Sequence, residues 1–203
     1  MTFQAGAASE NELCRGWRAG QQPEMPAVSA DLSLVLDQQR RAIVPAISSP
    51  IRWLFADTTW LACIYYSDSG PATICFHSVL NQPATPPQVF EHIFIHELLH
   101  LRIPPREVEG KRTIHPPEFW EEEARLSPLR RGAWHWIVLA FWHVLREDKE
   151  REGVRVLRRW RRCPLVRPGL WQTVERDLRE QAELRPPTPP KRGSLDPNGP
   201  GVF

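Results

Sequence analysis

Paired cysteines, lysine and long apolar runs are scarce in this 203-residue sequence. None of its four cysteines belongs to a CxxC pair. The sequence therefore supports neither a disulfide framework nor a cysteine-based zinc site, and we expect buried free thiols. The longest apolar stretch, residues 133–145, contains two histidines and is shorter than the ~20 residues that a membrane-spanning helix needs. The first residues lack the apolar core of a secretion signal. We expect a cytoplasmic protein with no membrane span.

Lysine is nearly absent, since Lys111, Lys149 and Lys191 are the lysines among 26 basic residues and all the others are arginine. We interpret this preference mainly as the codon bias of a GC-rich genome. A cluster of arginines is therefore not, by itself, evidence for binding to nucleic acid. The formal net charge of +2 does not require nucleic acid or an anionic membrane as a partner either.

The two ends of the sequence differ in composition from its middle. Residues 1–30 are rich in glycine, alanine, glutamine and proline, which predicts a loose leader. Residues 185–203 are polar and rich in proline, which predicts a disordered tail. The length suits one compact domain between these ends. We place it at residues 31–130, with a helical C-terminal extension packed on it at 131–184.

The first half of this domain predicts one helix followed by strands. Asp31 can cap a helix that reaches about Ile43. Residues 51–55, 60–66 and 73–79 are short runs of β-branched and aromatic residues, separated by turn-forming residues. This spacing predicts a small antiparallel sheet.

Helices are expected in the remainder of the chain. Prolines at 86–87 and at 104–105 bound an apolar segment that predicts a helix over 88–101. Further helices are expected from residue 118, over 132–162 and over 170–184. The expected fold class is α+β, a small antiparallel sheet packed on the helix at 88–101 and followed by a helical C-terminal part.

The helix at 88–101 contains the sequence His96-Glu97-Leu98-Leu99-His100. Helix residues i and i+4 lie on one face, so both imidazoles can reach the same ion. Catalytic zinc sites commonly use three protein ligands and leave the fourth position to water. Glu97 follows the first histidine, where its carboxylate can take a proton from that water. We therefore expect a zinc metallopeptidase in which His96 and His100 bind Zn²⁺ and Glu97 is the catalytic general base.

A third ligand is needed, and His115 is the candidate that we favour. It follows His100 by fifteen residues and stands at the start of the next expected helix. The alternative is that His115 only caps or packs against that helix. Acidic residues of the same helix are rival ligands, or else a solvated first turn that complements the helix dipole: Glu118, Glu121, Glu122 and Glu123.

The stretch His96-Glu-Leu-Leu-His-Leu, followed by His115-Pro-Pro-Glu-Phe-Trp120, resembles the YgjP/SprT-like metallopeptidases. In that family a short sheet precedes HELxHL, and a third histidine follows in a His-x-x-x-Phe-Trp context. The resemblance covers about residues 50–125. It implies zinc held by His96, His100 and His115, a catalytic Glu97, and a gluzincin-like minimal metallopeptidase domain within residues 31–130.

Two further histidines lie near the motif. His92 precedes His96 by one helical turn, and we interpret it as a packed neighbour, or as a hydrogen-bond donor to a ligand, rather than a fourth ligand. His77 belongs to the strand run at 73–79, where an ordinary strand position is favoured over a place in the cleft. The apolar run at 134–145 is interpreted as a buried packing helix, with a partner or membrane-surface role as the alternative.

An alternative function comes from a basic aromatic segment at 151–167, which includes Trp160. Its densest arginines are candidates for phosphate contacts: Arg158, Arg159, Arg161 and Arg162. The protein would then be a DNA-linked SprT-like protease or a non-catalytic nucleic-acid binder. The interspersed acidic residues and the general arginine preference argue against this reading.

The main prediction is hydrolysis of peptide bonds in a protein or peptide substrate. Zinc would activate water, and Glu97 would accept the proton and pass it to the leaving amine. The strand near 73–79, taken as an edge strand, would hold the substrate in extended form by β-addition.

Overall fold

The computed structural model describes residues 31–49, 51–67, 70–108, 110–149 and 152–183. The predicted leader at 1–30 and tail at 185–203 lie outside them. The elements are, in chain order, α2 (Leu32–Ile43), β1 (Arg52–Ala56), β2 (Ala62–Ser67), β3 (Gly70–His77), η1 (Ser78–Leu80), α3 (Pro87–Arg102), β4 (Arg106–Val108), β5 (Lys111–Thr113), α4 (Pro117–Leu126), α5 (Arg130–Phe141), η2 (Trp142–Val144), β6 (Leu145–Asp148), β7 (Gly153–Val156), η3 (Arg158–Arg162) and α6 (Leu170–Glu183). The predicted α+β class is confirmed.

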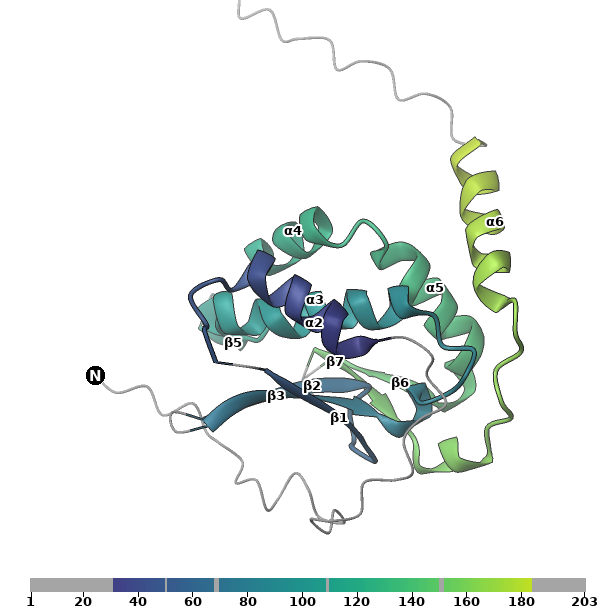
Figure 1. Ribbon diagram of the computed structural model, residues 1–203, viewed down its shortest axis with the longest axis horizontal. Coiled ribbons are helices and arrows are strands. Elements are labelled where there is room, and N and C mark those ends of the chain that lie inside the picture. The colour runs from purple at the N-terminus through teal and green to yellow at the C-terminus, as the bar shows by residue number, and fades with distance from the viewer. Residues whose placement is uncertain (1–30, 50, 68–69, 109, 150–151, 184–203) are drawn as a thin grey trace, which may run out of the picture.

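Helix α3, which carries the HELLH motif, is buried in the middle of the fold. Pro87 begins it and Pro86 stands at its N-cap, as the sequence predicts, and it ends at Arg102 before the next proline pair. Apolar residues cover most of its circumference, and Phe90, Phe94 and Leu98 have no exposed surface. A helix that is apolar on nearly all sides needs partners on all sides. In Figure 1 the sheet lies below α3, helix α2 lies across α3 in the view, and α4 and α5 lie above it.

The sheet beneath α3 has the strand order β1-β3-β2. Strands β2 and β3 pair antiparallel, as predicted, whereas β1 pairs with β3 in parallel, so the sheet is mixed. The prediction that the strand near 73–79 is an edge strand is wrong, because β1 and β2 flank it on both sides. Phe76 of β3 packs against Phe90 and Phe94, with ring centroids 5.2 and 5.0 Å apart. The edge strand that faces the motif helix is β2.

The C-terminal part contains a β-hairpin where the sequence predicts helix. The predicted helix over 132–162 is wrong beyond Phe141, because β6 and β7 pair antiparallel between residues 145 and 156. Valines alternate with polar residues along β7, which is the periodicity of a strand. Two backbone hydrogen bonds attach this hairpin beside the start of β2: Leu61 N–H to Val154 O at 2.9 Å and Val156 N–H to Thr59 O at 2.8 Å.

Helix α6, predicted over 170–184, packs against α5 and runs along one side of the molecule in Figure 1. Gly132 of α5 allows this approach, since a Cβ atom there would lie 3.2 Å from the Trp171 ring. Over the described residues, no helix combines the length and apolarity needed to cross a membrane.

Candidate metal centre

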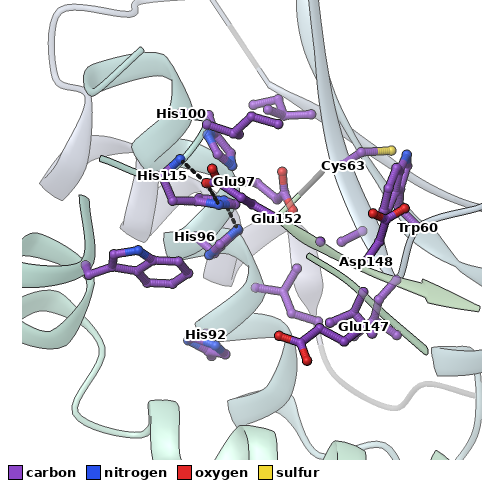
Figure 2. A pocket seen from close by; sticks show the side chains of 18 of the residues that line it. Trp60, Cys63, His92, His96, Glu97, His100, His115, Glu147, Asp148 and Glu152 are labelled. Carbon is purple, nitrogen blue, oxygen red and sulfur yellow. Dashed lines mark hydrogen bonds and ion pairs between the residues drawn. The ribbon is translucent and has the colours of Figure 1, made fainter. Parts of the chain in front are cut away.

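Three histidines from two segments converge beside α3. The helix places His96 and His100 on one face, one turn apart, and His115 stands immediately before α4. One ring nitrogen from each lies within 4.8 Å of the other two. Figure 2 shows the three histidines gathered around Glu97. This cluster could hold a metal ion.

The segment between His100 and His115 folds back on itself, which explains how a long spacer returns to the helix. Strands β4 and β5 form a short antiparallel hairpin in which Arg106 is opposite Thr113. Its two ends therefore lie side by side, and His115 follows only two residues after the second end. No strand is predicted there from the sequence.

The spacing of the ring nitrogens matches the needs of a tetrahedral ion. The Nε2 atoms of His96 and His115 are 3.2 Å apart. Two nitrogens bound at 2.0–2.1 Å to a tetrahedral zinc are separated by about 3.3 Å. The two rings are thus placed at the distance that a shared ion requires.

Carboxylates on the far sides of these rings support the same interpretation. Nδ1 of His96 lies 2.6 Å from Oε1 of Glu123, and Nδ1 of His115, which makes no hydrogen bond within the described residues, lies 3.4 Å from Oε2 of Glu152. A carboxylate attracts an N–H group, which favours the hydrogen on each Nδ1 and leaves the lone pair on each Nε2. Two lone pairs facing each other repel unless a cation lies between them. The donor set therefore fits a metal ion, and carboxylates placed behind ligating histidines are a common feature of metal sites.

Burial keeps these histidines in the neutral form that binds metal. It lowers the pKa of His96 to about 3 and the pKa of His100 to about 2, and repulsion from the neighbouring histidines adds to both shifts. Burial also lowers the pKa of His115, against the opposing charge of Glu152. At neutral pH, binding of a cation need not displace protons from these rings.

Glu97 is buried next to the histidine cluster, with 5 % of its surface exposed. Its carboxylate accepts a hydrogen bond from the backbone N–H of Ile64, on edge strand β2. Burial raises the pKa of Glu97 well above its ordinary value, and the nearby Cys63 and Glu123 add to the shift. A carboxylate whose pKa is raised in this way is suited to taking up a proton.

The cluster opens into a cleft of about 840 Å³. Helix α3 forms its floor, and residues 61–64, at the start of β2, and the β6–β7 hairpin line its walls. Three tryptophans contribute flat apolar surface to the lining: Trp60, Trp120 and Trp134. Figure 2 shows Cys63, Trp60 and Asp148 on the side of the cleft opposite the histidines.

The rival acidic ligands have other contacts. Glu118 pairs with Arg106, and Glu122 pairs with Arg102 and Arg125 at the surface. Glu121 is exposed. Glu123 is fully buried and contacts His96 at Nδ1, the nitrogen that faces away from His115. It is thus a partner of a candidate ligand, a role that the sequence did not predict.

The other two histidines near the motif lie apart from the cluster. His92 lines the cleft, and its Nδ1 lies 2.9 Å from Oγ of Ser127. His77 accepts a hydrogen bond from Val79 N–H, and its ring packs edge-on against Trp160. Burial lowers the pKa of both histidines to about 4.

The arginine-rich segment at 158–162 is a short 3-10 helix rather than part of a long helix. Arg159 donates a hydrogen bond to the carbonyl of His143, and Arg161 pairs with Asp57. Arg158 and Arg162 complete the predicted set, and contact of these four arginines with nucleic acid stays a prediction.

Glu152 is the second functional candidate that the sequence did not predict. It lies at the end of the turn of the β6–β7 hairpin, and its carboxylate accepts a hydrogen bond from His115 N–H at 2.9 Å. Glu123 could have been found, because it is four residues after the buried Phe119 and so lies on the buried face of α4. No comparable pattern marks Glu152.

No family model, curated protein or solved structure matches this chain. Function is therefore inferred from the geometry of the cleft.

Proposed function

We propose that this protein is a zinc-dependent peptidase that hydrolyses peptide bonds in the cleft beside α3. The observation that carries this proposal is the position of Glu97, a buried carboxylate between the three-histidine cluster and the exposed edge of a strand. Neutral imidazoles in this number suit zinc among the metals common in proteins. The same arrangement supports placing the protein among the YgjP/SprT-like metallopeptidases.

The proposed ligands are His96, His100 and His115. When bound there, zinc would polarise the scissile carbonyl and lower the pKa of water to about 7. Glu97 would accept the proton on its carboxylate and pass it to the leaving amine. The Ile64 N–H bond holds this carboxylate against β2, so proton transfer takes place beside the strand on which a substrate can lie.

Strand β2 offers backbone groups for an extended peptide. His77 N–H donates to Leu61 O at 2.9 Å within the β2–β3 register, so alternate residues from Leu61 face β3. The backbone groups of Ala62 and Ile64 therefore face the cleft, where the Ile64 N–H already donates to Glu97 and its carbonyl is left for a substrate. Strand β7 covers the edge at residues 59–61, and pairing with a substrate would begin at Ala62. The substrate strand is thus β2 and not the central strand near 73–79.

The test replaces Glu97 by glutamine and measures bound zinc and hydrolysis of an unfolded protein substrate. We expect Glu97→Gln to bind one zinc ion per chain and to lose at least about 100-fold in turnover. Glu91→Gln is the matched control, because Glu91 lies on the same helix and contacts Gln39 instead of the cluster. Full activity of the zinc-loaded Glu97→Gln variant would refute the assigned base.

A further inference from the structure

The turn of the β6–β7 hairpin contributes one side chain to the candidate metal centre. Glu152 is 37 residues from His115 in sequence, yet its Oε2 lies 2.9 Å from the backbone nitrogen of His115 and 3.4 Å from Nδ1 of its ring. We propose that Glu152 is a positioning residue for His115, setting both the rotation and the tautomer of the third ligand. This inference rests on the proposed function of the same site.

His115 needs such a partner more than the other two ligands do. Backbone hydrogen bonds of α3 fix His96 and His100, whereas His115 lies between a short hairpin and the first turn of α4. One carboxylate oxygen of Glu152 contacts the main chain and the ring of His115 together. A hydrogen on Nδ1, which the facing carboxylate favours, leaves the lone pair of Nε2 directed at His96.

The contact is built into the fold. His115 is 7 % exposed, and the side chain of Glu152 is 24 % exposed, so both groups lie largely beneath the surface. Strand β7, which begins directly after Glu152, is attached to the start of β2 through Leu61 and Val154. A side chain that orients a ligand is most effective on a rigid element of this kind.

The backbone of Glu152 gives an independent indication. Its φ angle is 50°, in the left-handed region that glycine adopts readily and that side chains with a Cβ atom adopt at a cost. Backbone stability alone therefore favours glycine at this position. A glutamate held there has a strained backbone, and the contact of its carboxylate with His115 is the feature that a glycine would lose.

This opposition between backbone stability and metal binding defines the experiment. The variants Glu152→Gly and Glu152→Gln are compared with the wild type by urea unfolding of the metal-free protein and by competition for zinc with a chelating dye. We expect the unfolding midpoint of Glu152→Gly to equal or exceed that of the wild type, because the strain is relieved. Its zinc dissociation constant should rise by about 10–100-fold. Glu152→Gln keeps an acceptor for His115 N–H without the charge, and its affinity should lie between the two.

Glu121→Gln is the control, since Glu121 is exposed on α4, and its zinc affinity should equal that of the wild type. Wild-type zinc affinity in both Glu152 variants would overturn the inference. Loss of folding in Glu152→Gly would also overturn it, because the residue would then be structural. A wild-type protein that binds no zinc would overturn the inference together with the proposed function. A wild type that binds zinc without hydrolysing peptides would refute the peptidase proposal alone. The positioning role of Glu152 would then be judged from the zinc dissociation constants of the Glu152 variants.

Discussion

Replacement of Glu123 by glutamine should weaken zinc binding without unfolding the protein. Glu123 is fully buried on α4, with Oε1 2.6 Å from His96 Nδ1 and Oε2 2.6 Å from Arg130 Nε. Glutamine keeps the shape of the side chain and can still accept a hydrogen bond from His96, but the bond is no longer charge-assisted. Nε2 of His96 then becomes a weaker donor to the metal. Loss of an orienting carboxylate commonly lowers metal affinity by about 10–100-fold, or about 1.4–2.7 kcal/mol.

The structure also limits what happens to the metal-free protein. Breaking a fully buried ion pair costs about 3–5 kcal/mol because a charge is left without a partner in the interior. Arg130, the charge left behind here, has 41 % of its side chain exposed and can turn towards water. Burial also raises the pKa of Glu123, so its charged form is costly in the folded state. We therefore expect the unfolding free energy to change by about 1–2 kcal/mol.

The assay is competition for zinc against chelators of graded affinity, with urea unfolding of the same preparations. Glu122→Gln is a close control, because it makes the same chemical change one residue away, at a side chain that pairs with Arg102 and Arg125. Its zinc affinity should match that of the wild type. Equal affinities in Glu123→Gln and the wild type would refute the idea that Glu123 tunes His96.

Two further predictions concern pH and metal removal. Burial lowers the pKa of His77 in the folded protein to about 4. Between about pH 6.5 and 4 the unfolded chain therefore takes up a proton at His77 that the folded protein does not, and the free energy of unfolding should fall as the pH is lowered through this range. His77→Asn keeps an acceptor for Val79 N–H, and urea unfolding at several pH values should show that this variant loses about 3 kcal/mol less stability than the wild type between these pH values. An unchanged pH dependence would contradict the lowered pKa of His77. Removal of zinc from the wild type should lower its stability by about 4 kcal/mol relative to zinc in thousandfold excess over its dissociation constant, measured by thermal unfolding. His100→Ala should lose this zinc dependence and His135→Ala should keep it, so a zinc-dependent shift that persists in His100→Ala would exclude the proposed ligand set.

The sequence predicts the fold best where the signals are local. Proline pairs mark both ends of α3 within a residue or two, and Asp31 caps α2 with a hydrogen bond to Leu34 N–H, as expected. The sequence does not predict the direction in which strands pair, because apolar and polar residues alternate in the same way in parallel and antiparallel strands. The β6–β7 hairpin is not predictable from local signals, because each strand has only four residues and β6 follows closely on an apolar helix. Its turn includes a left-handed glutamate, which is no turn signal.

In the candidate site, too, the residues placed by local geometry are predictable from the sequence and those placed by tertiary contacts are not. The i, i+4 spacing alone predicts that His96 and His100 share a face, since the helix fixes that geometry. The position of His115 near the other two histidines depends on the β4–β5 hairpin, which brings the two ends of the segment between His100 and His115 together. Strands of three residues are too short to show a clear alternation in the sequence. The orienting carboxylates are set by tertiary packing, and Glu152 in particular comes from a segment that the sequence assigned to a helix.

Helix α4 links His115 to the two histidines of α3, so a change in the position of this helix should affect all three candidate ligands. His115 stands directly before this helix. Glu123, which lies within the helix and on its buried side, contacts His96 on α3. A shift of α4 would therefore move one candidate ligand and the orienting partner of another together. Phe119 lies between them on the helix, fully buried, with its ring 4.7 to 5.1 Å from the rings of all three histidines. The packing of one aromatic side chain thus fixes the distance between the α3 histidines and His115, so the geometry of the cluster depends on the apolar core as much as on its polar contacts.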